Sequence, residues 1–215
     1  MCRPTPKKNF TKCLPIVILF FTALRILAAL RIPYMILADQ RYDDRMLFEN
    51  AYDLLSGVWL GSYDAYTLAK GIGYPMFLVL AKKLCLPYSV LLALLQAVGA
   101  WLFVRALSVR WKNPYGQTLL YLLLLFSPIS LTQLVTQRLY RMAIVPGMVL
   151  VVFSGMIGLT LRKELPLKKQ LPWAVLTGVA LAFFWQIRED SVWILPFIAV
   201  MTVWNVGYVI LALHK

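Results

Sequence analysis

Histidine is almost absent from this sequence: among 215 residues the one histidine is His214, next to the last residue. Histidine-based catalysis and multi-histidine metal sites are therefore disfavoured. Cysteine is scarce as well, and Cys2, Cys13 and Cys85 show no metal-ligand spacing. The first two cysteines flank a basic segment that we expect to stay in the cytosol, so we predict no disulfide.

Acidic residues are also few, nine against 22 lysines and arginines, which gives a formal net charge of +13. Such a balance can indicate nucleic-acid binding, but the basic residues here stand in short clusters between apolar runs, where the positive-inside rule places them. Hydrophobic residues make up 61% of the chain, more than the core of a soluble domain holds. We therefore predict a membrane protein with no nucleic-acid partner.

Six apolar runs approach the length of about 20 residues that a helix needs to cross a bilayer. They are residues 14–37, 87–109, 116–137, 139–161, 171–187 and 191–213. We expect an all-α fold, a polytopic membrane helix bundle of about six transmembrane helices that forms one module over residues 1–215. The first run has no small-residue cleavage site after it, so we interpret it as a retained helix and not as a signal peptide.

A seventh apolar patch, residues 72–86, decides between two topologies. It is only about 15 residues long and contains Lys82 and Lys83. If it crosses the membrane, the later basic loops fall outside the cell, against the positive-inside rule; if it does not, they share the cytoplasmic face with the N-terminus. We expect an amphipathic helix in the interface. The protein is then a multi-pass protein of the cell membrane with a cytoplasmic N-terminus and an extracytoplasmic active face.

The outer loop that follows the first run, residues 38–86, holds six of the nine acidic residues. Apolar residues recur in it at helical spacing and end at a glycine, which predicts a short helix on the membrane surface. They are Met46, Leu47, Ala51, Leu54 and Leu55, followed by Gly57. This outer side is also where we expect the remaining unexplained charges to gather.

Asp43 and Asp44 stand just beyond the first span. A carboxylate there could accept the proton of an attacking hydroxyl, as a general base does. Taken alone, the pair is more simply read as the solvated end of a loop.

Lys70 precedes a turn that contains Gly71, Gly73 and Pro75. The glycines would let the backbone approach a ligand closely while the lysine supplies a point charge for an anion. A plain junction between a loop and a helix, with the proline in the first turn, fits the same residues equally well.

Arginines stand at the predicted outer ends of three helices: Arg138, Arg141 and Arg188. A guanidinium beside lipid needs a partner, and it matches the geometry of a phosphate well. For Arg138 and Arg141 the alternatives are interfacial snorkelling or a salt bridge to a loop acid, and Arg188 could equally pair with its neighbours Glu189 or Asp190. Arg25 and Arg31 lie within the first run, and we expect both to face the bundle and meet a carboxylate.

The order of these features resembles the start of the GT-C superfamily of glycosyltransferases. The likeness rests on "YDD" at 42–44, "AYDLLSGVWLG" at 51–61 and "KGIGYPMFLVLAKKL" at 70–84. It is closest to the bacterial branch related to protein mannosyltransferases and lipid A aminoarabinose transferases. Asp43 and Asp44 match the acidic motif of the first outer loop, and Lys70 with the glycines and the proline matches the turn that follows. The turn departs from the family in lacking a double proline.

The resemblance implies transfer of a sugar from a polyprenyl-phosphate carrier to a lipid, glycan or protein acceptor on the outer face of the membrane. Asp43 would be the general base and Asp44 its partner. Lys70 would hold the departing phosphate, and we extend this substrate-binding role beyond the resemblance to the three outer arginines. No cofactor is required, although two adjacent carboxylates could hold a divalent metal.

Family members generally continue with more helices than the six expected here, which leaves open a truncated product, an N-terminal fragment or one half of a split enzyme. Two other readings stay open. One is a catalytically inactive or partial GT-C-like membrane subunit that binds a lipid carrier or assembles with a partner subunit. The other is a transporter, disfavoured because the charges lie beyond the helices and not near the middle of the bilayer.

Overall fold

The computed structural model describes residues 8–35, 44–59, 69–132, 137–188 and 191–213, and most of these residues are helical. The α-helices are α1 (Lys8–Ala29), α2 (Met46–Leu55), α3 (Gly73–Lys83), α4 (Tyr88–Leu107), α5 (Pro114–Leu125), α7 (Val145–Thr160), α8 (Leu167–Trp185) and α9 (Leu195–Leu213). Three short 3₁₀ helices accompany them: η2 (Pro128–Leu131), η3 (Arg141–Ala143) and η4 (Ser191–Ile194). Within these residues there is no strand beyond one isolated bridge, which confirms the predicted all-α class.

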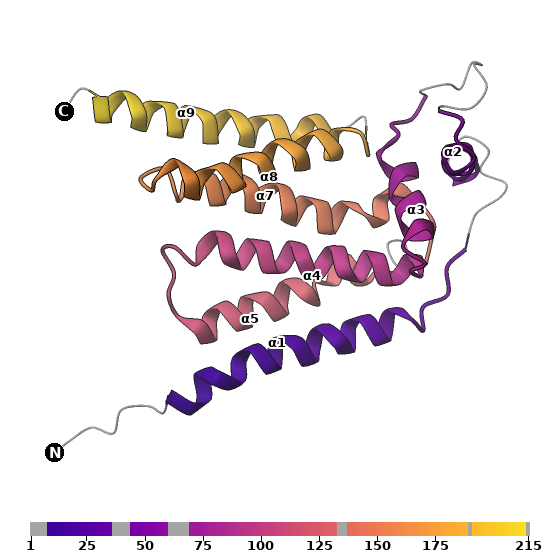
Figure 1. Cartoon of the computed structure of the whole chain (residues 1–215), viewed down its shortest axis with the longest axis horizontal. Coiled ribbons are helices and arrows are strands. Elements are labelled where there is room, and N and C mark those ends of the chain that lie inside the picture. Colours follow the sequence, from indigo (N-terminus) through magenta and orange to yellow (C-terminus); the bar gives the residue numbers. More distant parts are fainter. Residues whose placement is uncertain (1–7, 36–43, 60–68, 133–136, 189–190, 214–215) are drawn as a thin grey trace.

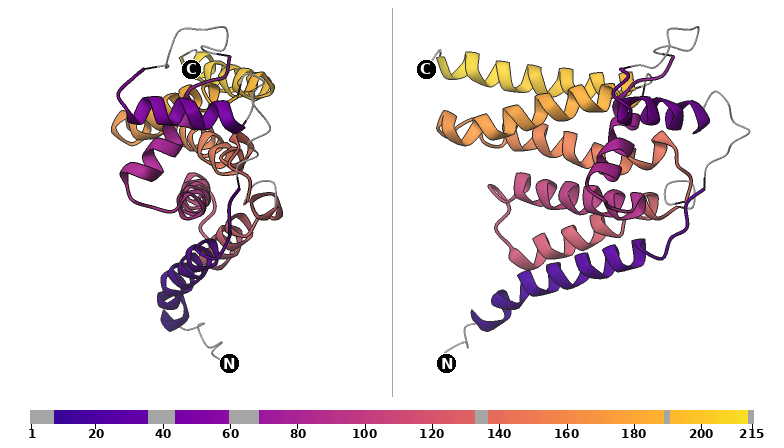
Figure 2. Two further views of the ribbon diagram at one scale, coloured as in Figure 1. Left: turned by 90° about the vertical axis from the view of Figure 1, so that its right-hand side faces the viewer. Right: turned by 45° about the vertical axis from the view of Figure 1, so that its right-hand side comes forward.

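Six long helices lie side by side and two short ones cover one end of the bundle (Figure 1). The long helices are α1, α4, α5, α7, α8 and α9, and α4 packs mainly on α7, which packs in turn on α8. Figure 2 shows α2 and α3 at the same end from two further directions. The connections 108–113 and 161–166 lie at the opposite end, so the bundle has two chemically different ends.

Three helical segments of the described chain are long and apolar enough to cross a membrane: Tyr88–Leu107, Pro114–Leu131 and Ser191–Tyr208. The segments Leu14–Ala29 and Val145–Thr160 are apolar but shorter. These lengths and compositions agree with a membrane protein, while the predicted number of six spans remains a prediction.

Three helix ends lie six or more residues inside the predicted apolar runs, each within four residues of a proline. The first helix ends at Ala29 and not near residue 37, because Pro33 lacks an N–H and disfavours helical backbone at the residue before it. The third predicted run gives a helix only to Leu125, and Ser127, which precedes Pro128, has an extended ψ of 129°. The fourth begins at Val145 and not at 139. The connection between these two helices is therefore much longer than the single residue that separates the predicted runs 116–137 and 139–161.

The two helices expected in the outer loop are present. α2 buries Met46, Leu47 and Ala51, and its chain turns at Gly57, which has a left-handed φ of 79°. α3 has 11 residues and would rise only about 16 Å, against about 30 Å for the apolar core of a bilayer. This helix alone is therefore too short to cross a membrane, and it lies across the end of the bundle (Figure 1).

The main core joins the covering helix α3 to the bundle. Tyr74 and Phe77 of α3 pack with Ile144, Phe184 and other buried residues of the 3₁₀ connection, α4, α7 and α8. The backbones of α4 and α7 approach closely, since a Cβ on Gly147 would lie 2.7 Å from the side chain of Leu95. Small residues permit such approaches between membrane helices. This packing fixes α3 against the end of the bundle where the candidate site lies.

Candidate functional site

The candidate site forms where the chain leaving α1 meets the segment before η3. Met35 donates its N–H to the carbonyl of Gln137 at 2.7 Å, and Leu139 donates its N–H to the carbonyl of Met35 at 3.0 Å. These two bonds hold the intervening Arg138 in extended backbone at the end of the bundle, beneath the start of α2. The pairing supplies hydrogen-bond partners to backbone groups that lie outside the helices.

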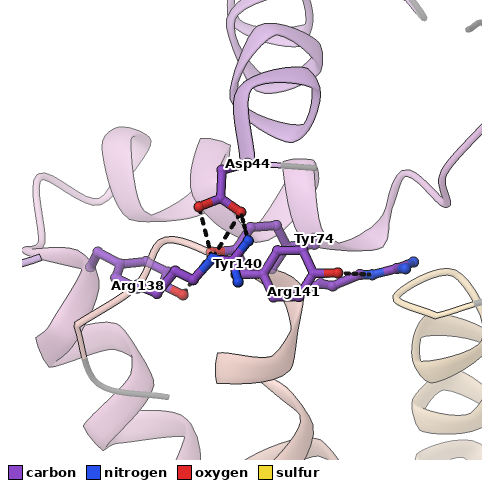
Figure 3. Close-up of polar contacts among 6 residues, drawn as sticks. Asp44, Tyr74, Arg138, Tyr140 and Arg141 are labelled. Carbon is purple, nitrogen blue, oxygen red and sulfur yellow. Dashed lines mark hydrogen bonds and ion pairs between the residues drawn. The ribbon is translucent and has the colours of Figure 1, made fainter. Parts of the chain in front are cut away.

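Asp44, two residues before the start of α2, forms a bidentate ion pair with Arg138 (Figure 3). Arg138 donates from Nη2 to Oδ1 at 2.7 Å and from Nε to Oδ2 at 2.9 Å. The side chain of Asp44 is 0% exposed and that of Arg138 is 20% exposed. Hydrogen bonding to this carboxylate raises the pKa of Arg138, so the guanidinium keeps its charge. The pair joins the outer loop to the bundle.

This pair changes the expected role of Asp44. Its carboxylate is buried and engaged by a guanidinium, which suits a residue that positions Arg138. The salt bridge to a loop acid, left open for Arg138 by the sequence, is thus present. Asp43, the predicted general base, lies outside the residues that the structure describes, so its role stays a prediction.

The ring of Tyr140 is the centre around which three predicted anion-binding side chains gather. The guanidinium of Arg138 lies 4.3 Å from the ring centroid, that of Arg141 lies 5.8 Å from it, and Nζ of Lys70 also lies 5.8 Å from it. Arg141 also donates from Nε to the Tyr140 hydroxyl at 3.4 Å. An aromatic face attracts cations and so lets three of them share one small region. We call these four residues the Tyr140 cluster.

Sequence reasoning did not single out Tyr140. The pattern "RLYR" at 138–141, an aromatic ring between two arginines, is the signal that could have indicated it. The three cations come from two parts of the chain about 70 residues apart, and only the fold brings Lys70 to the ring.

Lys70 is held near the ring by a close contact between its turn and α8. Gly73 donates its N–H to the carbonyl of Gln186 at 2.9 Å, and a Cβ on Gly71 would lie 2.2 Å from that oxygen. The glycines therefore serve an approach to the protein's own backbone, not the expected approach to a ligand. Pro75 lies in the first turn of α3, in agreement with a loop-to-helix junction.

Arg188 follows α8 and borders the cluster. Its Nη1 contacts the sulfur of Met142, the residue after Arg141. The structure thus brings this predicted phosphate ligand to the same end of the bundle, one residue removed from the cluster itself. Its alternative partners, Glu189 and Asp190, fall outside the described part of the chain.

Two tyrosines support the site from below. The hydroxyls of Tyr74 and Tyr88 lie 2.7 Å apart, and Tyr74 is fully buried. Burial raises the pKa of Tyr74 well above its usual value, with the neighbouring Tyr88 and the charge of Asp44 adding to the shift. Tyr74 therefore remains a neutral hydroxyl next to the Asp44–Arg138 pair.

An apolar groove of about 360 Å³ runs between α2, α3 and the start of α4. Apolar and aromatic side chains dominate its lining, among them Phe48, Leu55, Leu78 and Leu86. Leu139, which stands between Arg138 and Tyr140 in the chain, lines it as well, so the groove adjoins the cluster. An amphipathic ligand could place its apolar part in the groove and an anionic group at the cluster.

In the segments that the structure describes, no three His, Cys, Asp or Glu side chains lie together as a metal site would require. No protein-family model, curated protein or solved structure matches the chain. The GT-C resemblance therefore stays a prediction, carried by the sequence motifs alone.

Proposed function

We propose that this chain is a membrane glycosyltransferase that moves a sugar from a polyprenyl-phosphate carrier to an acceptor at the extracytoplasmic face. The observation that carries the proposal is the gathering of Lys70, Arg138 and Arg141 around Tyr140 beside an apolar groove. A lipid phosphate has the matching chemistry: an isoprenoid chain for the groove and an anion for the guanidinium forks.

The proposed topology has six crossings, α1, α4, α5, α7, α8 and α9, in a GT-C-like arrangement. Basic residues dominate the connections at the far end of the bundle and the helix ends beside them: Arg105, Arg110, Lys112, Arg162, Lys163, Lys168 and Lys169. The positive-inside rule assigns that end to the cytoplasm. The Tyr140 cluster, α2 and α3 then lie on the outer face, where a carrier-linked sugar and its acceptor meet.

In the proposed reaction an acceptor hydroxyl attacks the anomeric carbon of the carrier-linked sugar. Asp43 takes the hydroxyl proton, a new glycosidic bond forms, and the bond between the anomeric carbon and the phosphate oxygen breaks. The leaving lipid phosphate keeps the electron pair of that bond, and the cations of the cluster stabilise its charge. Attack opposite the leaving group inverts the anomeric centre. Asp44 acts as a positioning residue that orients Arg138.

A second function is a carrier-binding subunit without turnover. The observation in its favour is the engagement of Asp44 by Arg138, which leaves that carboxylate unsuited to proton transfer. The two functions share the binding step and differ in whether a sugar leaves the carrier. One set of experiments therefore distinguishes them.

The first experiment measures binding of radiolabelled C55 polyprenyl phosphate to the chain in nanodiscs, with the uncharged C55 polyprenol as comparison. Lys70→Gln and Arg141→Gln should each weaken binding of the phosphate about tenfold, the loss of one charged contact, and leave binding of the alcohol unchanged. Lys83→Gln and Arg45→Gln are the matched controls, since both side chains are exposed near the same helices. Equal affinity for phosphate and alcohol would refute the phosphate site.

The second experiment measures sugar transfer from a polyprenyl-phosphate-linked donor. Asp43→Asn should abolish transfer while binding of the carrier phosphate persists. Transfer retained by this variant refutes Asp43 as the base, and carrier binding by the wild-type chain without any transfer supports the carrier-binding subunit.

A further inference from the structure

Arg25 is an arginine inside the first apolar helix, and it is 5% exposed. Its Nη2 donates to the carbonyl of Ser130 at 3.2 Å, while its buried Nε has no hydrogen-bond partner. The expectation that it faces the bundle is confirmed, but the carboxylate partner expected for it is not found: among the described residues its partner is a carbonyl. The same expectation is wrong for Arg31, which lies beyond the end of α1 and is exposed.

A small cavity of about 20 Å³ adjoins Arg25. It lies between α1, α4, η2 and the start of α7, and Ser89, Gln96 and Ser130 are its other polar lining residues. A space of about 10–15 Å³ on this measure holds one water molecule, so the cavity admits a single small species and no polyatomic group such as a phosphate ester.

Two of the polar side chains that line the cavity already use a donor within the protein. Gln96 already donates its amide to the carbonyl of Leu124 at 2.7 Å, and Ser130 donates its hydroxyl to the carbonyl of Ser127 at 2.8 Å. The buried Nε–H of Arg25 has no hydrogen-bond partner among the described residues, and Ser89, which carries a hydroxyl, lines the same cavity. A species that accepts hydrogen bonds therefore fits the cavity.

Charge decides between the two small acceptors, water and a halide. A buried guanidinium without a counter-charge is unfavourable in an apolar surrounding, and among the described residues Arg25 has the Ser130 carbonyl as a partner but no carboxylate. Water would satisfy the Nε–H but would leave the charge uncompensated. A monovalent anion satisfies both the donor and the charge.

We propose that this cavity binds one halide ion, chloride under ordinary conditions, held by Arg25 Nε and the hydroxyl of Ser89. The site is separate from the proposed carrier site but adjoins it, because Ala143 of the 3₁₀ turn that begins at Arg141 lines the cavity. A bound anion compensates positive charge directly behind the Tyr140 cluster. The proposal does not depend on the glycosyltransferase function.

The first test is thermal unfolding of the chain in nanodiscs in sodium chloride against sodium gluconate at constant ionic strength. Chloride should raise the unfolding midpoint saturably, by about 2–5 °C, because it binds the folded state, and bromide should replace it. Arg25→Gln should abolish the halide response. Arg31→Gln removes an exposed arginine near the end of the same helix and should retain the response.

The second test is a crystal grown in sodium bromide, with anomalous scattering measured at the bromine edge. A peak within hydrogen-bond distance of Arg25 Nε supports the proposal, and its absence overturns it whatever the variants do. If Arg25→Gln fails to fold, Ser89→Ala keeps the arginine and should weaken the halide response about tenfold in concentration. An unchanged chloride dependence in Ser89→Ala refutes the assigned ligand set, and equal midpoints of the wild-type chain in chloride and gluconate refute the site itself.

Discussion

Asp44 and Arg138, 94 positions apart in the chain, form an ion pair with three donor–acceptor contacts between 2.7 and 3.1 Å. The pair links the start of α2 to the connection between α5 and α7. The carboxylate is fully buried in this contact. The same contact therefore holds both the Arg138 side chain and the segment that leads into α2. The attachment of α2 to the end of the bundle and the orientation of the proposed phosphate ligand therefore depend on one interaction.

Asp44→Asn should lower the free energy of unfolding by about 3 kcal/mol, because it leaves a partly buried guanidinium without its counter-charge. Glu49→Gln, in the same surface helix, breaks only the exposed pair with Arg45 and should cost less than about 0.5 kcal/mol. Denaturant unfolding of both variants in detergent micelles measures the two values. Equal costs for the two variants would contradict the role given to the buried pair.

Gly71→Ala should destabilise the protein by about 1–3 kcal/mol, because the new Cβ would meet the carbonyl of Gln186 at 2.2 Å and push the turn away from α8. The same change should lower the affinity for C55 polyprenyl phosphate, since it moves Lys70 from the Tyr140 ring. Gly178→Ala is the matched control, because its Cβ would meet nothing within 4 Å in the middle of α8. It should stabilise the protein by up to about 1 kcal/mol. Midpoints of denaturation for the two variants check both signs.

Apolar runs and apolar periodicity predicted the helical regions because they show which segments can bury a helix face in the protein or place it in a membrane. The positions of α2, α3 and the six long helices follow from them. Helix ends depended on single prolines within otherwise continuous apolar runs, and the effects of Pro33 and Pro128 were underestimated. The prolines were visible in the sequence. The sequence did not show that each would end a helix within a continuous apolar run.

The candidate site was predictable only as a set of residue types on one side of the membrane. Lys70 and Arg141 were identified as cations at outer turns, but their shared contact with Tyr140 arises from tertiary packing. The bidentate pairing of Arg138 was one of several open alternatives, because no local pattern joins positions 44 and 138. Contacts between distant segments cannot be read from spacing along a single chain.

Arg162, at the opposite end of the bundle, donates hydrogen bonds to backbone carbonyls of two helices. It donates to the carbonyls of Arg105 and Ala106 at the end of α4 and to that of Gly158 in α7, at 2.7, 3.1 and 3.1 Å. Its guanidinium also lies 4.2 Å from the ring centroid of Trp173. Lysine and arginine side chains commonly satisfy the last carbonyls of helices in this way.

Arg162→Gln should lower the free energy of unfolding by about 2–3 kcal/mol, because buried carbonyls of two helices lose a charged donor. Arg110→Gln, an exposed arginine at the same end with a 3.4 Å contact to Glu164, should cost less than about 0.5 kcal/mol. Denaturant unfolding compares the two variants. Because the change lies far from the Tyr140 cluster, the affinity of folded Arg162→Gln for C55 polyprenyl phosphate should remain that of the wild-type chain. A loss of affinity would show that the two ends are coupled.

Tyr74 predicts how stability depends on alkaline pH. Burial raises the pKa of its hydroxyl well above the usual value of about 10, so the unfolded chain loses this proton at a lower pH than the folded chain does. The folded state binds the proton more tightly, and its contribution is complete below pH ~10 and declines as the pH rises further. The slope attributable to this group is at most about 1.4 kcal/mol per pH unit.

Tyr74→Phe should remove that slope and lower stability at pH 8 by about 1 kcal/mol through loss of the bond to the Tyr88 hydroxyl. Tyr115→Phe changes a tyrosine that is 49% exposed and should follow the wild-type curve. Denaturant midpoints between pH 8 and about 11.5 in detergent micelles give the three curves, and lysine titration is common to all of them. If the midpoints of Tyr74→Phe and of the wild-type chain fall in parallel above pH ~10, burial does not hold the hydroxyl neutral. That result would contradict the close packing of α3 against the bundle at Tyr74.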